Sequence, residues 1–243
     1  VTSMDEVSDA RAVLLDVAPR AFVDIAGDRL PGRYRRALGR YRYGNAAAKV
    51  DFALSAPVPW TNPLLADAGT VHVGGTRAAI AASEANVAAG RHSTDPYVLV
   101  SQPTRFDPSR APEGKHILWA YTHVPQGSTL DQTEAVIRQI ERFAPGFRDT
   151  ILAASSRTAV EMEEYNPNYI GGDIASGEAS LFQLARRPVL SLNPWATPLR
   201  GVYLCSSATP PGPGVHGLAG WYAARRALAS EFGVNTPPSL SSR

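Results

Sequence analysis

Polar and apolar residues alternate along several short stretches of the chain, and this alternation predicts strands. Residues 49–55 show the pattern of a half-buried strand. Residues 97–101 and 116–122 are two further β-prone runs, and the turn-rich residues 105–114 between them predict a hairpin with a long loop. A fourth strand is expected at residues 202–205. In the strand expected at 116–122, Ile117, Trp119 and Tyr121 lie on one face.

Apolar residues at helical spacing, with capping and breaking residues around them, predict five helices. Asp9 is the expected N-cap of the first, with Pro19 closing it, and Ser128 or Thr129 is the expected cap of the fourth, which Pro145 stops. The five expected helices cover residues 9–17, 31–42, 76–90, 130–144 and 215–230. The amphipathic face of the fourth carries Val136, Ile137, Ile140 and Phe143.

The order of these elements favours the α+β class. Strands and helices follow one another without a regular strand–helix–strand alternation. An antiparallel or mixed sheet that carries helices is therefore the expected architecture, rather than a parallel sheet wound on both faces.

Composition narrows the class of protein. With 44% hydrophobic and 19% charged residues the chain is typical of globular proteins, and a net charge of +2 gives no reason to expect a nucleic-acid partner. The single cysteine, Cys205, excludes an internal disulfide and favours a reducing, cytoplasmic compartment. This cysteine ends a strand expected to be buried, and we expect it to be an inert apolar residue.

The segment that carries chemistry is the predicted strand at 202–205, the glycine-rich loop after it and the alanine-rich helix that follows. Glycines allow a ligand to approach the backbone closely, and a helix start supplies unpaired N–H groups with a partial positive charge. Together they suit a phosphate or the reducible edge of a flavin. A purely structural turn is the alternative, because the loop has neither a Walker lysine nor a Gly-x-Gly-x-x-Gly pattern.

This segment resembles the C-terminal flavin-binding signature of the phytoene desaturase-like oxidoreductases, a branch of the FAD-dependent amine oxidase superfamily. The match is closest to the pyridine nucleotide-disulphide oxidoreductase domain-containing subgroup. Other motifs in the order of that family lie at residues 43–51, 72–75, 107–112, 144–147, 166–173 and 187–188. The likeness therefore covers nearly the whole chain.

The resemblance implies a substrate-binding domain over residues 1–190, with part of an interdomain connection near 1–45. Residues 191–243 would be the returning C-terminal strand and helix of a discontinuous FAD-binding domain. The family's N-terminal Rossmann unit has no counterpart in this sequence, so we expect Val1 to mark a truncation. The parent would pass hydride from a small, lipophilic organic substrate to FAD, and this chain alone would bind FAD weakly or not at all and be inactive.

Residue by residue, the resemblance places two groups of side chains and backbone near the flavin. The loop group would border the isoalloxazine ring and ribityl chain: Ser207, Thr209, Pro210, Gly212, Gly214, Val215, His216 and Gly217. A second group would approach from the substrate domain: Gly171, Gly172 and Asp173. The sequence departs from the family at Pro213, where a glycine is usual, and at Ser206 and Ser207, where many relatives place a carboxylate.

Several residues keep alternative interpretations. His216 is the one acid–base candidate, and a loop-anchoring role competes with it. The remaining histidines, His72, His92, His116 and His123, lack metal-ligand spacing, so no metal site is expected.

Two segments are rich in charged residues, and the first of them is open to more than one interpretation. The arginines and tyrosines at 33–43 predict either a solvated helix face or peripheral membrane contact, and the glutamates at 161–164 predict an exposed helix end.

The runner-up function is a non-catalytic binding module that forms a homodimer through its exposed flavin-side surface.

Overall fold

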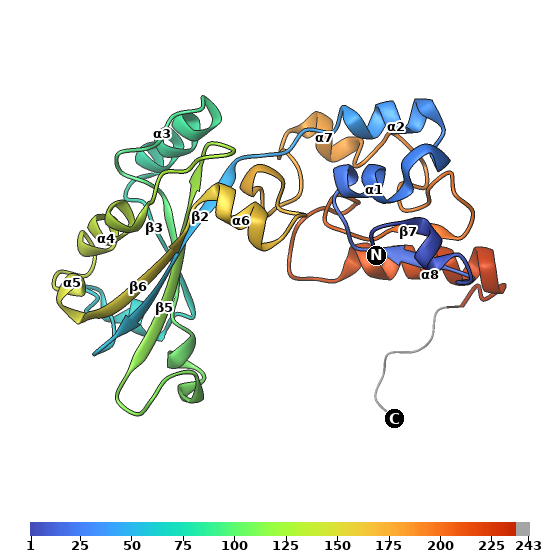
Figure 1. Ribbon diagram of the computed structural model, residues 1–243. Helices are drawn as coiled ribbons and strands as arrows, with labels where there is room; N and C mark the ends of the chain where they lie inside the picture. The colour runs from blue at the N-terminus through green and yellow to red at the C-terminus, as the bar shows by residue number, and fades with distance from the viewer. Residues whose placement is uncertain (237–243) are drawn as a thin grey trace. The chain divides into compact units, whose positions relative to one another are not determined.

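The computed structural model describes residues 1–236, which form two compact units (Figure 1). The sheet unit contains residues 45–166 and 171–173. The terminal unit contains residues 1–44, 167–170 and everything described from 174 onward.

The sheet unit is built on five antiparallel strands in the order β3-β4-β5-β2-β6. The strands are β2 (Ala46–Leu54), β3 (Thr70–Val73), β4 (Val98–Ser101), β5 (His116–Val124) and β6 (Ile151–Arg157). The two nine-residue strands β2 and β5 pair along their whole length, from Ala46 opposite Val124 to Leu54 opposite His116. Side chains alternate between the faces of a sheet, so this register decides which residues share a face.

One face of the sheet forms the main hydrophobic core. Helices α4 (Thr133–Glu141) and α5 (Phe147–Thr150) contribute residues to this core, and Figure 1 shows them beside one face of the sheet. The unit also contains α3 (Arg77–Ala88) and α6 (Ala159–Tyr165). Val136 and Ile140 of α4 are fully buried in the same cluster as Val50 and Phe52 of β2. Phe52 meets Phe147 edge to face, with ring centroids 5.4 Å apart.

The terminal unit joins segments from the two ends of the described chain. Its strand β1 (Val13–Leu15) pairs in parallel with β7 (Val202–Leu204). Its helices are α1 (Pro19–Ala26), α2 (Gly32–Gly39), α7 (Leu181–Ala185) and α8 (Leu218–Phe232). Phe22, Leu38 and Leu204 are buried in one cluster, so the first forty residues pack against the last strand.

Short 3-10 turns connect these elements. They are η1 (Met4–Val7), η2 (Gly27–Arg29), η3 (Pro63–Asp67), η4 (Pro103–Arg105), η5 (Pro108–Arg110) and η6 (Ile170–Gly172).

Among residues 1–236 no helix has both the length and the apolar character needed to cross a membrane.

Much of the expected element order is confirmed. The α+β class with an antiparallel sheet is confirmed, and the strands expected at 49–55, 97–101, 116–122 and 202–205 appear as β2, β4, β5 and β7. β4 and β5 form the expected hairpin. Thr76 caps α3 as expected, because its hydroxyl accepts a hydrogen bond from the Ala79 amide.

Two expectations about helices are wrong. Residues 9–17 are not a helix: they contain β1, because pairing with β7 offers this apolar run a sheet partner, and Pro19 begins α1 instead of closing a helix. Neither Ser128 nor Thr129 caps α4, which begins after Gln132. The Ser128 hydroxyl accepts from Leu130, and Asp131 accepts from the Thr133 amide.

The compact units divide the chain at points other than residue 190. Residues 1–44 and 174–190 lie in the same unit as residues 191–236. The roles given to residues 1–190 and 191–243, substrate binding and cofactor binding, stay predictions, and residues 237–243 lie outside the described part.

Candidate functional site

The loop between β7 and α8 holds eight of the expected site residues and folds as a series of tight turns. The Thr209 amide and hydroxyl both donate to the Ser206 carbonyl, at 2.9 and 2.8 Å, and the Gly212 amide donates to the Thr209 carbonyl at 2.9 Å. Gly212 and Gly214 have φ values of +104° and +154°, which side-chain-bearing residues rarely adopt. The glycines are therefore required by the backbone itself.

The two halves of this loop differ in exposure. Ser206, Thr209 and Gly212 are buried, and Ser207 and Pro210 are half-buried. Residues 213–218 are exposed, and Val215 has no contact that shields its side chain. The second half is thus the accessible part of the loop, whereas the first half fixes it to the protein.

Aromatic side chains of the terminal unit hold the loop from the side. The Trp195 indole N–H donates to the Pro210 carbonyl at 3.0 Å. The same indole stacks on Tyr222 of α8, with ring centroids 4.9 Å apart. Trp195 therefore connects the middle of the loop to the helix that follows it.

A buried arginine lies beneath the loop. Arg187 is 2% exposed, its Nε donates to the Tyr41 hydroxyl at 3.0 Å, and one Nη donates to the Ser176 carbonyl at 3.3 Å. No carboxylate within residues 1–236 forms an ion pair with this guanidinium. Buried cations are usually paired with an anion. The guanidinium under this loop is therefore an unusual, uncompensated positive charge. Nothing in the sequence around Arg187 predicts this burial, because arginine side chains are mostly exposed in proteins.

His216 lies at the start of α8. Its Nδ1 accepts a hydrogen bond from the Leu218 amide at 3.0 Å, and the N-cap Gly217 has a left-handed conformation with no side chain to cap the helix. A Cβ on Gly214 would lie 2.7 Å from the His216 ring. The imidazole thus substitutes for a capping side chain, which fits the loop-anchoring interpretation, and its acid–base role stays a prediction.

The second expected group, residues 171–173, lies in the sheet unit. The Gly171 amide donates to the Glu163 carboxylate at 2.7 Å, and its carbonyl accepts from the Gly127 amide at 2.9 Å. A Cβ on Gly172 would lie 2.7–2.8 Å from atoms of Ala159. Close packing therefore accounts for both glycines within this unit, and their approach to a flavin stays a prediction.

These contacts also refine the expectation for the acidic cluster. Glu163 is half-buried and binds the Gly171 backbone, whereas Glu161 forms a capping box with Thr158 at the start of α6. The side chains of Glu161 and Glu164 are exposed, as expected for a helix end. Glu163 is only half-buried and also holds the Gly171 backbone, which the expectation did not include.

The sheet brings together aromatic and titratable side chains that are far apart in sequence. On the face opposite the main core, β5 presents a half-buried row of Ile117, Trp119, Tyr121 and His123. We call this row the aromatic row. His123 Nδ1 lies 2.9 Å from the Glu84 carboxylate, and Tyr97 contacts both His72 and His123. Sequence spacing alone made these histidines look scattered.

Burial raises the pKa of both phenols on this face. Burial raises the pKa of Tyr97, and the neighbouring Tyr121 and Glu84 raise it further. Burial also raises the pKa of Tyr121, with a smaller contribution from Glu84. Both hydroxyls therefore stay uncharged hydrogen-bonding groups at neutral pH.

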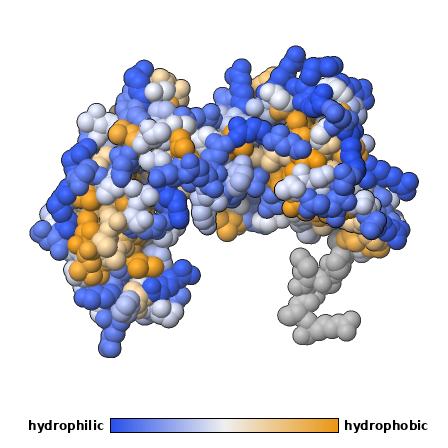
Figure 2. All heavy atoms as spheres, viewed as in Figure 1, coloured by the Kyte–Doolittle hydropathy of each residue, from blue (hydrophilic) through white to orange (hydrophobic). Residues whose placement is uncertain are grey.

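The carboxylates of the face are paired. Lys49 bonds the Asp51 carboxylate, and Glu84 faces His123. A shallow hollow of about 330 Å³ lies over β2, β5 and β6, with Asp51, Trp119 and Ser155 in its lining. Figure 2 shows hydrophobic residues gathered over the region that carries β6. Among residues 1–236 no group of three His, Cys, Asp or Glu side chains is placed to hold a metal ion.

Sequence comparison gives two kinds of relative, although no family model matches the chain. The chain is 34% identical over 147 residues to pyridine nucleotide-disulfide oxidoreductase domain-containing protein 2 of Mus musculus, covering 56% of this chain and 25% of that protein. It is 34% identical over 68 residues to phytoene dehydrogenase of Streptomyces griseus, covering 28% of this chain and 13% of that protein. The predicted resemblance to phytoene desaturase-like oxidoreductases is confirmed.

Structure comparison supports the fold. An oxidoreductase from Methanosarcina mazei matches with a TM-score of 0.54 and 15% identity, over 89% of this chain and 42% of that one. A putrescine oxidase variant matches with a TM-score of 0.50 and 13% identity, over 89% of this chain and 41% of that one. The chain thus spans about two fifths of these solved oxidoreductases and a quarter of the mouse relative.

Proposed function

We propose that this chain is the substrate-domain and C-terminal part of an FAD-dependent oxidoreductase of the phytoene desaturase and amine oxidase type. In the complete protein, hydride would pass from an organic substrate to the flavin. The observation that carries the proposal is the β7–loop–α8 arrangement, in which glycines with positive φ expose backbone next to a helix start and above the buried Arg187.

The residues fit the electron-rich end of a flavin. The exposed backbone of 213–217 has two glycines with no side chain to block a planar ring, and the first-turn N–H groups of α8 add partial positive charge. The guanidinium of Arg187 adds a full positive charge on the buried side of the same loop. When bound, FAD would supply the hydride-accepting chemistry, and the protein would supply binding, orientation and electrostatics.

The ADP half of the cofactor needs a separate site. The described loop differs from the Gly-x-Gly-x-x-Gly pattern that holds a dinucleotide pyrophosphate. The chain also spans only a fraction of its relatives' length. Both facts support the proposal that a further segment of the complete protein holds the ADP half, and that this chain alone retains FAD weakly or not at all.

A visible absorbance scan tests this proposal. The purified chain is mixed with FAD, desalted and scanned, alone and after co-expression with the part of the mouse relative that lies outside the matched region. We expect a colourless chain alone and a flavin band in the combined sample. A Gly214→Val variant should lose the band, whereas a Gly220→Ala variant, with open space at that position, should keep it. A combined sample that stays colourless would contradict the proposal.

The aromatic row supports an apolar substrate rather than a cationic one. Trp119 and Tyr121 offer flat apolar surface, and both carboxylates beside them already face a cationic or imidazole partner. An amine would therefore find no unpaired carboxylate among the described residues of this face. In the combined sample we expect phytoene, and not putrescine, to bleach the flavin band, with Trp119→Ala slowing the reaction. Bleaching by putrescine alone would reverse this assignment.

Self-association without catalysis is the second candidate function. Several large apolar side chains of the terminal unit are exposed, among them Leu181, Leu190, Leu192 and Val215. Such exposed groups favour burial against another surface. Sedimentation of the chain alone would support this candidate if a dimer forms and if Leu192→Lys abolishes it, and a monomer at all concentrations would oppose it.

A further inference from the structure

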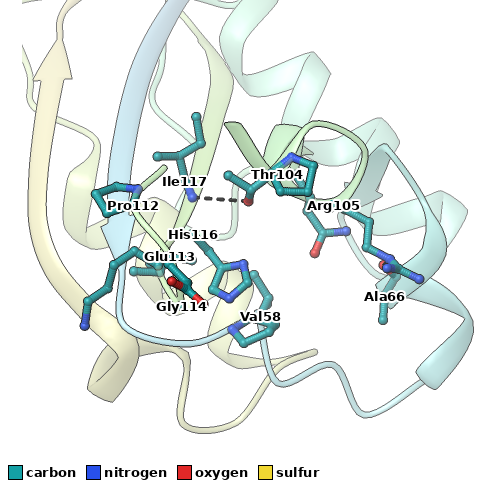
Figure 3. A pocket seen from close by; sticks show the side chains of 14 residues that line it. Val58, Ala66, Thr104, Arg105, Pro112, Glu113, Gly114, His116 and Ile117 are labelled. Carbon is teal, nitrogen blue, oxygen red and sulfur yellow. Dashed lines mark hydrogen bonds between the residues drawn. The ribbon is translucent and has the colours of Figure 1, made fainter. Parts of the chain in front are cut away.

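The sheet unit contains another pocket, which Ile117 of the aromatic row lines but Trp119, Tyr121 and His123 do not. It has a volume of about 460 Å³ and opens between η4, η5 and the start of β5 (Figure 3). Leu54, Val58 and Ile117 contribute apolar walls, and Leu54 and Val58 also belong to the main core. The pocket is of the size that proteins use for small ligands.

The polar atoms inside the pocket are already satisfied by the protein. The Gln102 side-chain amide donates to the carbonyls of Leu65 and Ala68, at 3.0 and 2.8 Å, and accepts from the Trp60 indole at 2.9 Å. The Thr104 hydroxyl accepts from the Ile117 amide (Figure 3). The Gln102 and Thr104 side chains therefore need no hydrogen bond from a ligand, so the pocket favours a ligand whose buried part is apolar.

The walls are stiff enough to keep the pocket open without a ligand. Pro57, Pro108 and Pro112 line it, and the proline ring fixes φ. Asp107 further fastens η5, because its carboxylate accepts from the Ser109 amide and pairs with Arg110. Hydrogen bonding to Ser109 and Arg110 also lowers the pKa of Asp107. Water resting on rigid apolar walls is readily displaced by an apolar group.

The charges at the mouth cancel. Arg105 bonds the Ala66 carbonyl and pairs with Asp67, while Lys115 and Glu113 carry opposite charges. The remaining polar group is the imidazole of His116, which reaches into the opening in Figure 3. In the described part of the chain this imidazole has no hydrogen-bond partner. The mouth thus offers the His116 imidazole for hydrogen bonding, beside charged side chains whose formal charges sum to zero.

We propose that this pocket binds a compact, uncharged apolar molecule, about the size of a bicyclic aromatic, whose single hydroxyl or carbonyl group meets His116. The apolar walls take the body of the ligand, and the neutral mouth disfavours a charged head. The site requires neither a flavin nor the loop after β7, so it stands or falls separately from the oxidoreductase function.

The first experiment titrates the full chain with 1-naphthol by calorimetry at pH 8. Ala66→Trp places a bulky ring at the mouth from an exposed position, and Ala85→Trp makes the same change at an exposed position of α3 as a matched control. We expect binding to the wild type and the control and at least tenfold weaker binding to Ala66→Trp. Absence of binding to the wild type, or equal affinity in both variants, would overturn the proposal.

The second experiment tests the recognition of the head group. His116→Leu keeps the bulk of the side chain and removes its hydrogen bond, so 1-naphthol should bind about fivefold more weakly. The carboxylate 1-naphthoate should bind the wild type more weakly than 1-naphthol, because the formal charges at the mouth sum to zero and apolar walls cannot solvate a carboxylate. Unchanged affinity in His116→Leu, or tighter binding of 1-naphthoate, would contradict the assigned ligand class.

Discussion

The guanidinium of Arg187 lies so close under Gly212 that a Cβ at residue 212 would come within 2.6 Å of its Nη1. Tyr41 and Ser176 hold the other nitrogens of the same guanidinium, and the Tyr41 hydroxyl donates to the Ser176 carbonyl at 2.7 Å. One side chain therefore ties the glycine loop to two other segments of the terminal unit. The shape of the loop depends on this contact.

Gly212→Ala should destabilise the terminal unit. Its methyl group would collide with the guanidinium, and a φ of +104° is unfavourable for alanine, so we expect a loss of about 1–3 kcal/mol. Urea unfolding followed by circular dichroism measures this loss. Gly220→Ala is the control: it lies in α8 with open space around it, and should be neutral or stabilising by about 0.5–1 kcal/mol. Equal stability of the two variants would show that Gly212 is not constrained.

Substitutions of Arg187 separate packing from charge. Arg187→Ala removes two hydrogen bonds and leaves a large cavity, so it should cost about 2–4 kcal/mol. Arg187→Met fills much of the same volume and removes a buried charge that lacks a carboxylate partner, so it should cost less than half as much. Urea unfolding of both variants decides the point. If Met costs as much as Ala, the hydrogen bonds to Tyr41 and Ser176 dominate.

Asp131 should make stability depend on pH in the acid range. Hydrogen bonds from the hydroxyl and amide of Thr133, and from Ser156, hold the pKa of Asp131 below its ordinary value of 3.8. A lowered folded-state pKa means stability that is present above about pH 4 and is lost as pH falls through the folded pKa. Asp131→Ala should therefore cost about 0.5 kcal/mol at pH 7, because solvent screens this exposed carboxylate, and less at pH 2.5.

The matched variant for this position is Asp131→Asn. Asparagine retains an oxygen that accepts from Thr133 at every pH, so its stability relative to wild type should rise as the pH is lowered. Unfolding midpoints of the three proteins at both pH values measure the difference. A cost of Asp131→Ala that stays constant between pH 7 and pH 2.5 would exclude the carboxylate as its source.

Cys205 should react slowly in the folded protein. Burial, with a smaller contribution from Asp16, raises the pKa of its thiol to about 11. The reactive thiolate is therefore scarce at pH 8, as the inert interpretation of this residue requires. Labelling with iodoacetamide at pH 8 should be much slower in buffer than in urea. Equal rates in the two solvents would show that the strand end is open to solvent.

Local patterns were sufficient where an element's signal lies within its own residues. β2 follows from alternation in the stretch 49–55, and Thr76 caps α3 because a hydroxyl reaches the amide three residues on. The glycine loop after β7 could be identified from its residues, since left-handed conformations require glycine wherever they occur. The family resemblance followed from the same motifs.

Other features depend on partners distant in sequence. The apolar run Val13–Leu15 could have formed a helix, and only β7 made it a strand. β6 was not expected, because its exposed, alanine- and serine-containing sequence has a weak pattern, and pairing with β2 decides it.

By itself, then, the sequence determined the fold class, the main strands and the glycine loop, because those signals are local. The tertiary structure decided that Arg187 is buried under the loop and that His72, Tyr97 and His123 share one face. Burial and proximity are properties of the packed chain: they arise when sheet register and segment docking bring distant residues together, and spacing along the sequence does not encode them.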